Sequence, residues 1–512
     1  MNKLSLLKYN RNKKQLLPNI MDIKLLLKPF LVATLAAGVF ISCSDDDNPV
    51  GPNPDPDPTE SLHPYADDIV ENGVILSEPI EGDRTLSADS VYYLDGYVFV
   101  ESGTLTIEPG TVIMAFEEPS SVAEGNETSL IITRDAQIDA EGTAEDPIIF
   151  TSELDGEPLG ESLILNQTNS KLWAGLIILG QAPIDSEGAD EVQIEGIPDG
   201  EARALYGGED PDHSSGILKY VSIRFSGAEI GPGDEIQGLT LGGVGRGTTI
   251  EYIDIFVSAD DGIEIFGGTV DIRNISVAFA EDDSFDFDLG WSGTGQYMFA
   301  LQGGNGADHG GEWDGAKPDN NSSYSTASFY NSTFIGLGLN STERSEDAPA
   351  IIMRDGSAYS LYNSIVTDFN GLGIQIEDKN ESEDSYDRTI NNVNGDDASI
   401  AGNIWFTGNA SSIETMISVT GESARDADGS VTASWLNDRD NVFEDPELGG
   451  ICRTQGCGVL NPVPASATAT TLVVTVSDSN IDQTTYVGAF EPGQTTWISG
   501  WTTLARYGYL AD

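Results

Sequence analysis

The sequence predicts an all-β protein whose body is a parallel β-helix with a capping C-terminal segment, and two observations carry this prediction. From Tyr97 onward, short β-rich runs such as Leu130–Thr133 and Leu218–Phe225 alternate with Gly, Asn, Asp and Pro, and no stretch keeps a 3.6-residue periodicity. The second observation is internal repetition: Ile253–Phe266 aligns with Ile275–Asp288 at a shift of 22 residues. A repeat that also copies the turn residues is typical of one coil of a β-helix, whose strands stack on their equivalents one coil away.

The repeat also separates this architecture from two alternatives. Tyr330–Ile335 aligns with Tyr362–Thr367 at a shift of 32 residues, so loops of different size lengthen the coils. A propeller needs regular blades of about 40 residues, which this spacing does not supply. A jelly-roll sandwich remains an alternative, although it does not explain a copy that includes turn residues.

The composition is strongly acidic. The chain has 512 residues, with 84 acidic against 24 basic ones and a formal net charge of −60. With 39% hydrophobic residues it can bury a large core, as one large domain or a few ordinary ones. Because the charge repels phosphate backbones, we expect no nucleic-acid partner. Adaptation to saline surroundings also explains such acidity, and in that case much of it marks no site.

Residues 1–43 have the features of a signal peptide. Basic residues precede the apolar run Pro29–Ile41, which is too short for a bilayer because spanning one needs ~20 residues. Cys43 follows a small residue, and this junction resembles the lipobox of bacterial lipoproteins, whose cysteine is diacylated, for instance with palmitate. Met21 would start a signal of ordinary length, and an uncleaved hydrophobic anchor is the alternative.

Residues 44–61 form an acidic, Pro-rich stretch that cannot continue a helix or a central strand, so we predict a semi-rigid tether. Acidic residues directly after the cysteine resemble the surface-export signal of Bacteroidetes lipoproteins. The resemblance implies an outer-membrane protein that faces the cell exterior and is anchored to lipid through Cys43. We divide the remainder into a β-helix over 62–400, and last coils with a C-terminal cap over 401–512.

The remaining cysteines, Cys452 and Cys457, are close in sequence and have a glycine between them. An even pair in an exported protein predicts a small local disulfide. A zinc site is excluded here, because two thiolates without a nearby histidine do not fill a zinc coordination shell.

Several motifs of the body resemble one family. Gly103–Ile113, Trp173–Gly180, Ala259–Gly268 and the ending Tyr486–Thr502 are similar to the right-handed parallel β-helix (pectin-lyase-like) surface lipoproteins of Bacteroidetes. The resemblance covers most of residues 70–512. It implies a right-handed β-helix at the cell surface and little about activity, since members are mostly uncharacterised.

The 22-residue repeat carries acidic residues at matching positions. If the apolar residues of each strand point inward, alternation turns Glu264, Asp286 and Asp288 outward. Stacked coils lie ~4.8 Å apart, so we expect Glu264 beside Asp286 and Asp260 beside Asp282, like charge next to like charge. Calcium relieves such repulsion, because it is a hard ion that takes several carboxylate oxygens. We therefore predict that these five residues form a metal site, with a solvated acidic face as the alternative.

His309 is the histidine with the most polar neighbours in the sequence, namely Asp308, Glu312 and Asp314. This group could serve as a metal corner or as an acid/base pair. The alternative is a loop histidine in a Gly-rich crossover between strands.

Two enzyme classes occur on the fold that the resemblance implies. Its polysaccharide lyases pair calcium with a Lys or Arg base, and its polygalacturonases combine neighbouring Asp residues with Gly-His-Gly and Arg-x-Lys motifs. Asp260 and Asp261 faintly resemble the second class, but neither of those motifs occurs in the chain. Arg273 or Lys317 beside the acidic residues would favour an enzyme.

Trp497 and Trp501 lie four residues apart near the C-terminus. We expect them to pack as a lid over the last coil, because the end of a solenoid exposes apolar side chains and an open β edge. Stacking on sugar rings is the alternative.

The sequence favours a non-catalytic surface lipoprotein whose β-helix binds a glycan or a protein of the envelope or a neighbouring cell. The tether, the repeats and the missing catalytic motifs support this function. The alternative is an extracellular polysaccharide lyase or glycoside hydrolase.

Overall fold

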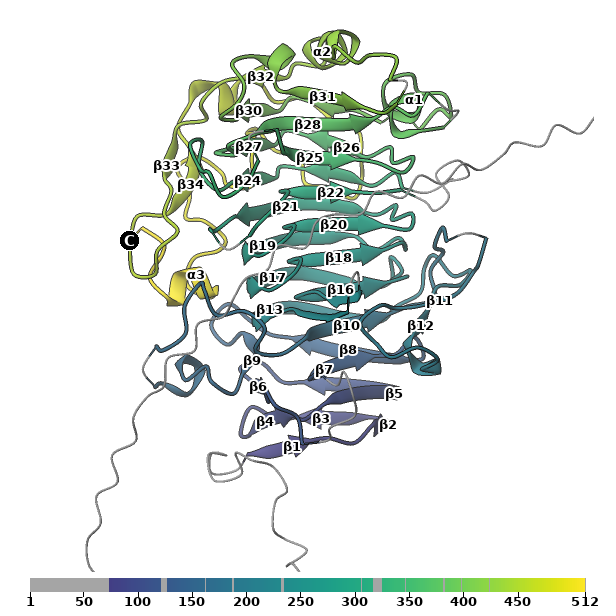
Figure 1. The fold of residues 1–512 in the computed structure, drawn as a ribbon. Coiled ribbons are helices and arrows are strands. Elements are labelled where there is room, and N and C mark those ends of the chain that lie inside the picture. The colour runs from purple at the N-terminus through teal and green to yellow at the C-terminus, as the bar shows by residue number, and fades with distance from the viewer. Residues whose placement is uncertain are drawn as a thin grey trace, which may run out of the picture. The chain divides into compact units, whose positions relative to one another are not determined.

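The computed structural model describes residues 73–511, apart from 121–126, 162, 187, 232–233, 305, 316–324, 346, 381–382, 397 and 423. The predicted signal peptide, Cys43, the tether and Lys317 therefore lie outside the described residues. From Val74 to Phe443 the chain winds into successive coils of a right-handed parallel β-helix with three faces (Figure 1). The predicted fold class, an all-β protein built as a parallel β-helix, is confirmed.

The strands of each face pair in parallel with their equivalents in the next coil. The first face contains β2 (Ile80–Glu81), the first half of β5 (Tyr97–Ile107), β7 (Ser129–Ile132), β10 (Gly175–Leu179), β16 (Leu239–Gly242), β18 (Ile263–Phe266), β20 (Phe285–Asp288), β22 (Gly311–Trp313), β25 (Pro349–Met353), β28 (Leu372–Glu377) and β31 (Ile417–Thr420).

The second face begins with short strands and continues with the first halves of four long ones. It contains β3 (Arg84–Leu86), the second half of β5, β8 (Ala136–Glu141), β13 (Gly216–Ser226), β17 (Thr249–Ser258), β19 (Ile272–Ala280), β21 (Thr294–Leu301), β23 (Ser328–Tyr330), β26 (Ser360–Tyr362) and β29 (Ile400–Ala401).

The third face takes the second halves of β13, β17, β19 and β21. Its other strands are β1 (Val74–Leu76), β4 (Val91–Leu94), β6 (Val112–Ala115), β9 (Ile148–Ser152), β24 (Thr333–Ile335), β27 (Ile365–Thr367), β30 (Ile404–Phe406) and β32 (Val442–Phe443).

Smaller elements decorate this body. They are the antiparallel pairs β11 (Val192–Gln193) with β12 (Leu205–Tyr206), β14 (Ala228–Gly231) with β15 (Asp234–Ile236) and β33 (Leu448–Gly450) with β34 (Asn461–Pro464), the helices α1 (Ser385–Thr389), α2 (Ser430–Asn437) and α3 (Thr503–Arg506), and the 3-10 turns η2 (Glu157–Leu159), η3 (Ala202–Ala204), η4 (Ile413–Thr415) and η5 (Ala467–Thr470).

The second and third faces meet at a bend where the backbone is left-handed. In six successive coils the residue at this bend has φ between 49° and 61°, and we call these residues the bend ladder: Tyr220, Tyr252, Asn274, Tyr297, Asn331 and Asn363. Asparagine is enriched in this conformation among residues other than glycine.

The predicted register is confirmed. Ile263 pairs with Phe285 and Ile265 with Phe287 at the shift of 22 residues, and Tyr330 pairs with Tyr362 at the shift of 32. The inward side chains of β18 and β20 are fully buried and belong to one continuous core that runs through the coils. Burial of alternate residues on stacked strands therefore explains why the sequence repeats.

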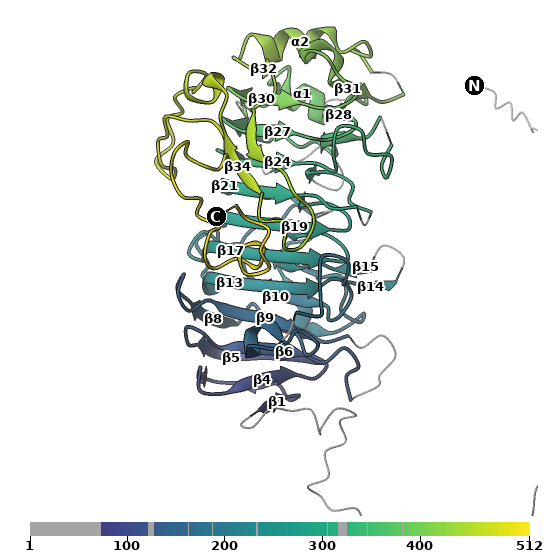
Figure 2. The same cartoon turned by 90° about the vertical axis from the view of Figure 1, so that its left-hand side faces the viewer.

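The expectation that Trp497 and Trp501 close the last coil is wrong. That end is covered by α2, whose Leu436 is buried in the same core (Figure 1). The C-terminal segment, which we define as residues 448–511, instead runs back along the side of the coils (Figure 2). Trp497 there contacts Tyr252, and Trp501 contacts Tyr220. Since α2 already covers the apolar end, these tryptophans pack on the bend ladder.

Within the C-terminal segment, Cys452 and Cys457 are joined by a disulfide. Among the described residues, no helix is both long and apolar enough to cross a membrane.

Candidate functional site

Three consecutive coils of the first face carry acidic residues in register. Glu264 of β18 lies beside Asp286 of β20, and Asp286 lies beside Glu312 of β22. We call the whole set the acidic cluster, and each coil supplies one row of it. The first row is Asp260, Asp261 and Glu264, the second is Asp282, Asp283, Asp286 and Asp288, and the third is Asp308, His309, Glu312 and Asp314. The strands thus stack carboxylates directly on carboxylates, where repulsion is strongest.

The turn that precedes each strand explains part of this pattern. The amide of Asp283 donates a hydrogen bond of 2.9 Å to Oδ1 of Asp261, one coil earlier, and the amide of His309 donates to Oδ1 of Asp283. A Cβ on Gly262 would lie 2.3 Å from Cγ1 of Val277, so the turn admits only glycine there. Asp261 and Asp283 therefore have a structural role in stacking the turns, in addition to any ligand role.

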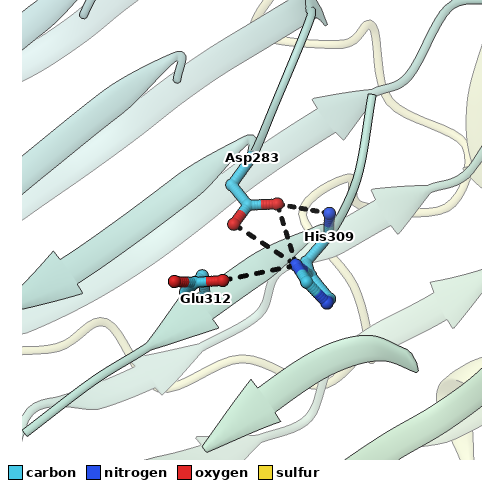
Figure 3. Close-up of side chains that lie close together, drawn as sticks. All are labelled: Asp283, His309 and Glu312. Atoms are coloured by element: carbon cyan, nitrogen blue, oxygen red, sulfur yellow. Dashed lines mark hydrogen bonds and ion pairs between the residues drawn. The ribbon is translucent and has the colours of Figure 1, made fainter. Parts of the chain in front are cut away.

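His309 lies against the second and third rows of the cluster (Figure 3). Its Nδ1 is 3.1 and 3.3 Å from the two carboxylate oxygens of Asp283, and 3.6 Å from Oε2 of Glu312. Burial raises the pKa of Asp283, but the charge and hydrogen bonds of His309 outweigh it and hold that pKa below its usual value. Burial conversely lowers the pKa of His309, and Asp283 more than restores it. The two form a charge pair.

One corner of the cluster is neutralised by arginine. Arg354 donates from Nε to Oδ1 of Asp314 at 2.8 Å and from Nη2 to Oδ2 at 2.7 Å, and it also contacts Glu312. Nearby, Nε of Arg344 donates to Oδ1 of Asp308 at 2.7 Å. Bidentate pairs of this kind are the strong ones. The third row is therefore partly compensated.

The first two rows lack such compensation. Burial first, and neighbouring carboxylates second, raise the pKa values of Asp261, Glu264 and Asp286 well above their usual range. Oδ1 of Asp286 is buried and accepts no hydrogen bond from any residue that the structure describes. A buried carboxylate oxygen without a donor needs a bound proton or a cation to offset the cost of burying its charge.

The rim of the cluster titrates near neutrality. Burial, followed by the neighbouring carboxylate of Asp283, raises the pKa of Asp282 to about 7 and that of Glu312 to about 8. Burial also raises the pKa of Glu195 to about 7. Glu195 reaches the cluster from outside the coils and accepts a 2.8 Å hydrogen bond from Gln237, whose amide is 3.4 Å from Asp260.

Three sets of side chains are arranged so that one cation could contact every member. Within each set the ligand atoms lie within 4.8 Å of one another: Asp260, Asp261 and Asp282; Asp261, Glu264 and Asp286; Asp283, His309 and Glu312. Twice a calcium–oxygen distance of about 2.4 Å gives this separation, so carboxylate oxygens of the first two sets fit calcium. The third set includes an imidazole, which suits a softer ion better.

The structure brings most of the predicted metal ligands together. Asp260, Glu264, Asp282 and Asp286 contribute to the two oxygen-rich sets, whereas Asp288 belongs to none of the three. Arg273, named above as a possible base, is not beside the cluster. It lies on the second face, where it pairs with Asp482 and lies over the ring of Tyr297. The bend of the chain after β18 turns it away from the first face.

From the sequence, we considered His309 apart from the 22-residue repeat, as a metal corner, an acid/base group or a loop histidine, but its segment is the third row of the same stack. Asp308, His309, Glu312 and Asp314 follow Asp282, Asp283, Asp286 and Asp288 at a shift of 26 residues. That matched spacing is the signal that could have revealed the third row. Glu195 has no comparable signal.

The chain was compared with known proteins by structure, by sequence and by family. Among solved structures, the enzymatically active domain of tailspike protein 2 from bacteriophage CBA120 is similar, with 14% identity and a TM-score of 0.25, over 64% of this chain and 42% of that one. No curated protein sequence matches significantly. Residues 78–439, which include every coil that carries the acidic cluster, match the pectate-lyase like beta helix domain. With most of its length matched, the chain belongs to the family of pectate-lyase-like β-helix domains.

Proposed function

We propose that this protein is a cell-surface lipoprotein whose acidic cluster binds calcium and whose β-helix presents a face for a glycan or an envelope partner without catalysis. The observation that carries the calcium proposal is the stacking of Glu264 on Asp286 within a set of oxygens that one ion can reach. Calcium binding would turn a repulsive contact between coils into an attractive one.

Calcium is favoured over magnesium by the ligands. The first two sets offer carboxylates from turns and strands of adjacent coils, with separations that suit a large ion of six to eight oxygen ligands. Magnesium demands a smaller octahedron and gives up its waters reluctantly. The third set, with His309, is less suited to either ion.

Thermal unfolding tests this proposal. Millimolar calcium should raise the melting temperature far more than sodium chloride of equal ionic strength, because an ion that binds only the folded state at a hundredfold excess over its Kd stabilises by about 2.7 kcal/mol. Magnesium should have a smaller effect. Equal shifts with calcium and sodium would show that the cluster is only a charged surface.

A quadruple variant locates the effect. Its substitutions are Asp260→Asn, Glu264→Gln, Asp282→Asn and Asp286→Asn, and we expect it to lose the calcium response while gaining stability without calcium. A matched control removes four exposed carboxylates elsewhere, with Asp89→Asn, Glu161→Gln, Asp199→Asn and Asp438→Asn. The control should keep the full calcium response, and a response lost in both variants would contradict the assignment.

The proposal of lipid anchoring rests on Cys43 and on the resemblance of its surroundings to a lipobox. Cell fractionation tests it. Cys43→Ala should move the protein from the membrane fraction to the soluble fraction, and accessibility to an added protease should show that the wild-type faces outward. A Cys43→Ala protein that stays in the membrane would contradict the lipoprotein assignment.

Glycoside hydrolysis is the second candidate, and the split of pKa values in the cluster favours it. Despite burial, His309 lowers the pKa of Asp283, whereas burial and then Glu312 raise the pKa of Asp286, and a pair of carboxyl groups shifted in opposite directions can act as base and acid. The test is a screen of neutral and anionic polysaccharides for new reducing ends or unsaturated ends. New ends formed by wild-type and lost in Asp283→Asn would replace the non-catalytic proposal.

A further inference from the structure

We propose that a second site, on the flank of the β-helix, binds one neutral sugar residue. A pocket of about 180 Å³ lies where the C-terminal segment crosses β19 and β21. Its lining combines polar and aromatic side chains: Asn274, Tyr297, Tyr486, Phe490, Gln494 and Trp497. None of these residues belongs to the acidic cluster, so this proposal is independent of the calcium site.

The first argument comes from the three asparagines of the bend ladder. Nδ2 of Asn331 donates to the carbonyl of Tyr486 at 2.9 Å. Asn363 makes a complete pair with Val474, donating to its carbonyl at 2.9 Å and accepting from its amide at 2.9 Å. At these two positions the asparagine amide therefore holds the backbone of the C-terminal segment.

Asn274 occupies the same ladder but has no such partner. It is only 6% exposed, and its side chain makes no hydrogen bond to any residue in the described part of the chain. It lines the pocket, at the place where its counterparts meet backbone. Because Asn274 lines the pocket and its amide has no partner within the described part of the chain, its donors and acceptor are available for polar groups of a ligand.

The aromatic walls are held rigidly. The ring of Trp497 stacks on Phe490 with centroids 5.7 Å apart, and its Nε1 donates to the carbonyl of Ala489 at 3.1 Å. Arg273 lies over the ring of Tyr297, 5.7 Å from its centroid. Because these side chains are already ordered, little of their conformational entropy is lost when a ligand binds.

Size and chemistry select the ligand. At about 30 Å³ for each water, the pocket has room for roughly six waters, which suits one sugar ring and not an oligosaccharide. A sugar ring offers apolar C–H faces to aromatic walls and hydroxyls to an amide. Glu491 at the pocket and the net charge of −60 disfavour anionic sugars. A quaternary ammonium would suit the aromatic rings, but it would leave Asn274 unsatisfied.

Ligand-observed NMR with a set of methyl glycosides (glucoside, galactoside and mannoside) and N-acetylglucosamine tests the proposal on the chain from residue 62 onward. At least one should bind saturably with a Kd on the order of 1 mM, and should change the fluorescence of the protein's tryptophans. Asn274→Gly, which tolerates the left-handed backbone, should weaken binding by about tenfold or more without lowering the melting temperature.

Asn363→Gly is the matched control, because it makes the same change on the same ladder but outside the pocket. It should lower the melting temperature and leave the affinity for the sugar within about twofold, since additivity holds for distant sites. Asn274→Asp, which keeps the shape and removes the donors, covers the case in which the glycine variant folds poorly.

Three outcomes would overturn the proposal. The first is no saturable binding of any glycoside at about 100 mM, a hundredfold above the expected Kd. The second is binding that both Asn274 variants leave unchanged, which would place the sugar elsewhere. The third is binding of tetramethylammonium in place of the glycosides, which would make the pocket a cation site. All of these binding measurements are made without calcium, so they test the sugar site even if the calcium proposal fails.

Discussion

Two regions of the β-helix bury charged side chains: the acidic cluster on the first face, and the interface that holds the C-terminal segment on the third. In the interface, the fully buried Arg224 lies 2.8 Å from Glu157 and 3.3 Å from Asp155, and the hydroxyl of Tyr507 donates to Asp155 at 2.9 Å. In the first two rows of the cluster, by contrast, carboxylates face carboxylates. In the interface a buried arginine offsets the cost of burying these carboxylates, whereas Asp261, Glu264 and Asp286 of the cluster are buried mainly beside other carboxylates.

We infer from this difference that buried charge has a structural role in the interface and a functional role in the acidic cluster. Asp254 accepts hydrogen bonds from the amide and hydroxyl of Thr503 and from Ser222, which fastens α3 to β17. Oδ1 lacks a described donor in both Asp254 and Asp286, so what distinguishes Asp254 is the set of three donors that its Oδ2 receives. The carboxylates that the chain leaves uncompensated, Asp261, Glu264 and Asp286, are best explained by a partner from outside, whether cation or proton.

The largest expected effect is the loss of stability when the interface loses its buried arginine. Arg224→Met should lower the free energy of unfolding by about 3–5 kcal/mol, because it leaves the buried Asp155 without its counter-charge, whereas Glu157 keeps only Arg506. Urea denaturation measures the loss, and limited proteolysis should show early release of the C-terminal segment. Lys219→Met, which removes a partly exposed pair with Glu251 at 3.5 Å, should cost at most about 1 kcal/mol. Equal losses in the two variants would refute the comparison.

A second effect concerns pH in the absence of calcium. The folded pKa values of Glu195 and Asp282 are about 7 and that of Glu312 about 8, all above the unfolded value. A group whose pKa is raised on folding stabilises the protein below its unfolded pKa, and this contribution is lost as the pH rises through the folded pKa. Stability should therefore fall between pH 5 and pH 8, by on the order of 2–3 kcal/mol.

The raised pKa of His309 acts in the same direction over this window. The lowered pKa of Asp283 acts oppositely, but only in more acidic solution, below the usual pKa of an aspartate. Melting temperatures measured across this range, with and without calcium, check the expectation. Stability that rises from pH 5 to pH 8 without calcium would contradict the account of the cluster.

The third and smallest expected effect is a change in the free energy of unfolding when one carboxylate is neutralised, and its sign should differ between the two regions. Without calcium at neutral pH, Glu264→Gln should raise the free energy of unfolding by about 1 kcal/mol, because it removes a repelled charge. Asp155→Asn should lower it by about 1–3 kcal/mol, since Arg224 loses a partner. Chemical denaturation of both variants under one condition gives the comparison, and a shared sign would show that the regions do not differ.

The coils and two rows of the cluster could be predicted because strand alternation and stacking produce a local, periodic pattern in the sequence. Glu264 and Asp286 are outward residues of equivalent strands, so the 22-residue shift is enough to bring them together. His309 was harder to place, because its row follows after a longer loop and replaces an Asp by His. The position of Glu195 beside the cluster and the surroundings of Asn274 depend on segments that return from elsewhere in the chain. No short-range pattern in the sequence indicates such contacts.

The position of Trp497 and Trp501 shows the same limit. Their chemistry suits a lid, but which apolar surface they cover depends on whether another element has already closed the last coil. α2 does so through Leu436, at a position where the sequence has no strong helical periodicity. Competition between two candidate caps is decided by tertiary packing.

Calorimetric titration of calcium at neutral pH tests the central claim most directly, since it measures binding and proton release together. In two buffers of different ionisation enthalpy, the wild-type chain should bind calcium saturably and release protons, because ligands with raised pKa values must give them up. The quadruple variant with Asp260, Glu264, Asp282 and Asp286 neutralised should show neither effect. Absence of saturable binding by the wild-type, or binding that the quadruple variant retains in full, would contradict the claim that the acidic cluster is a cation site.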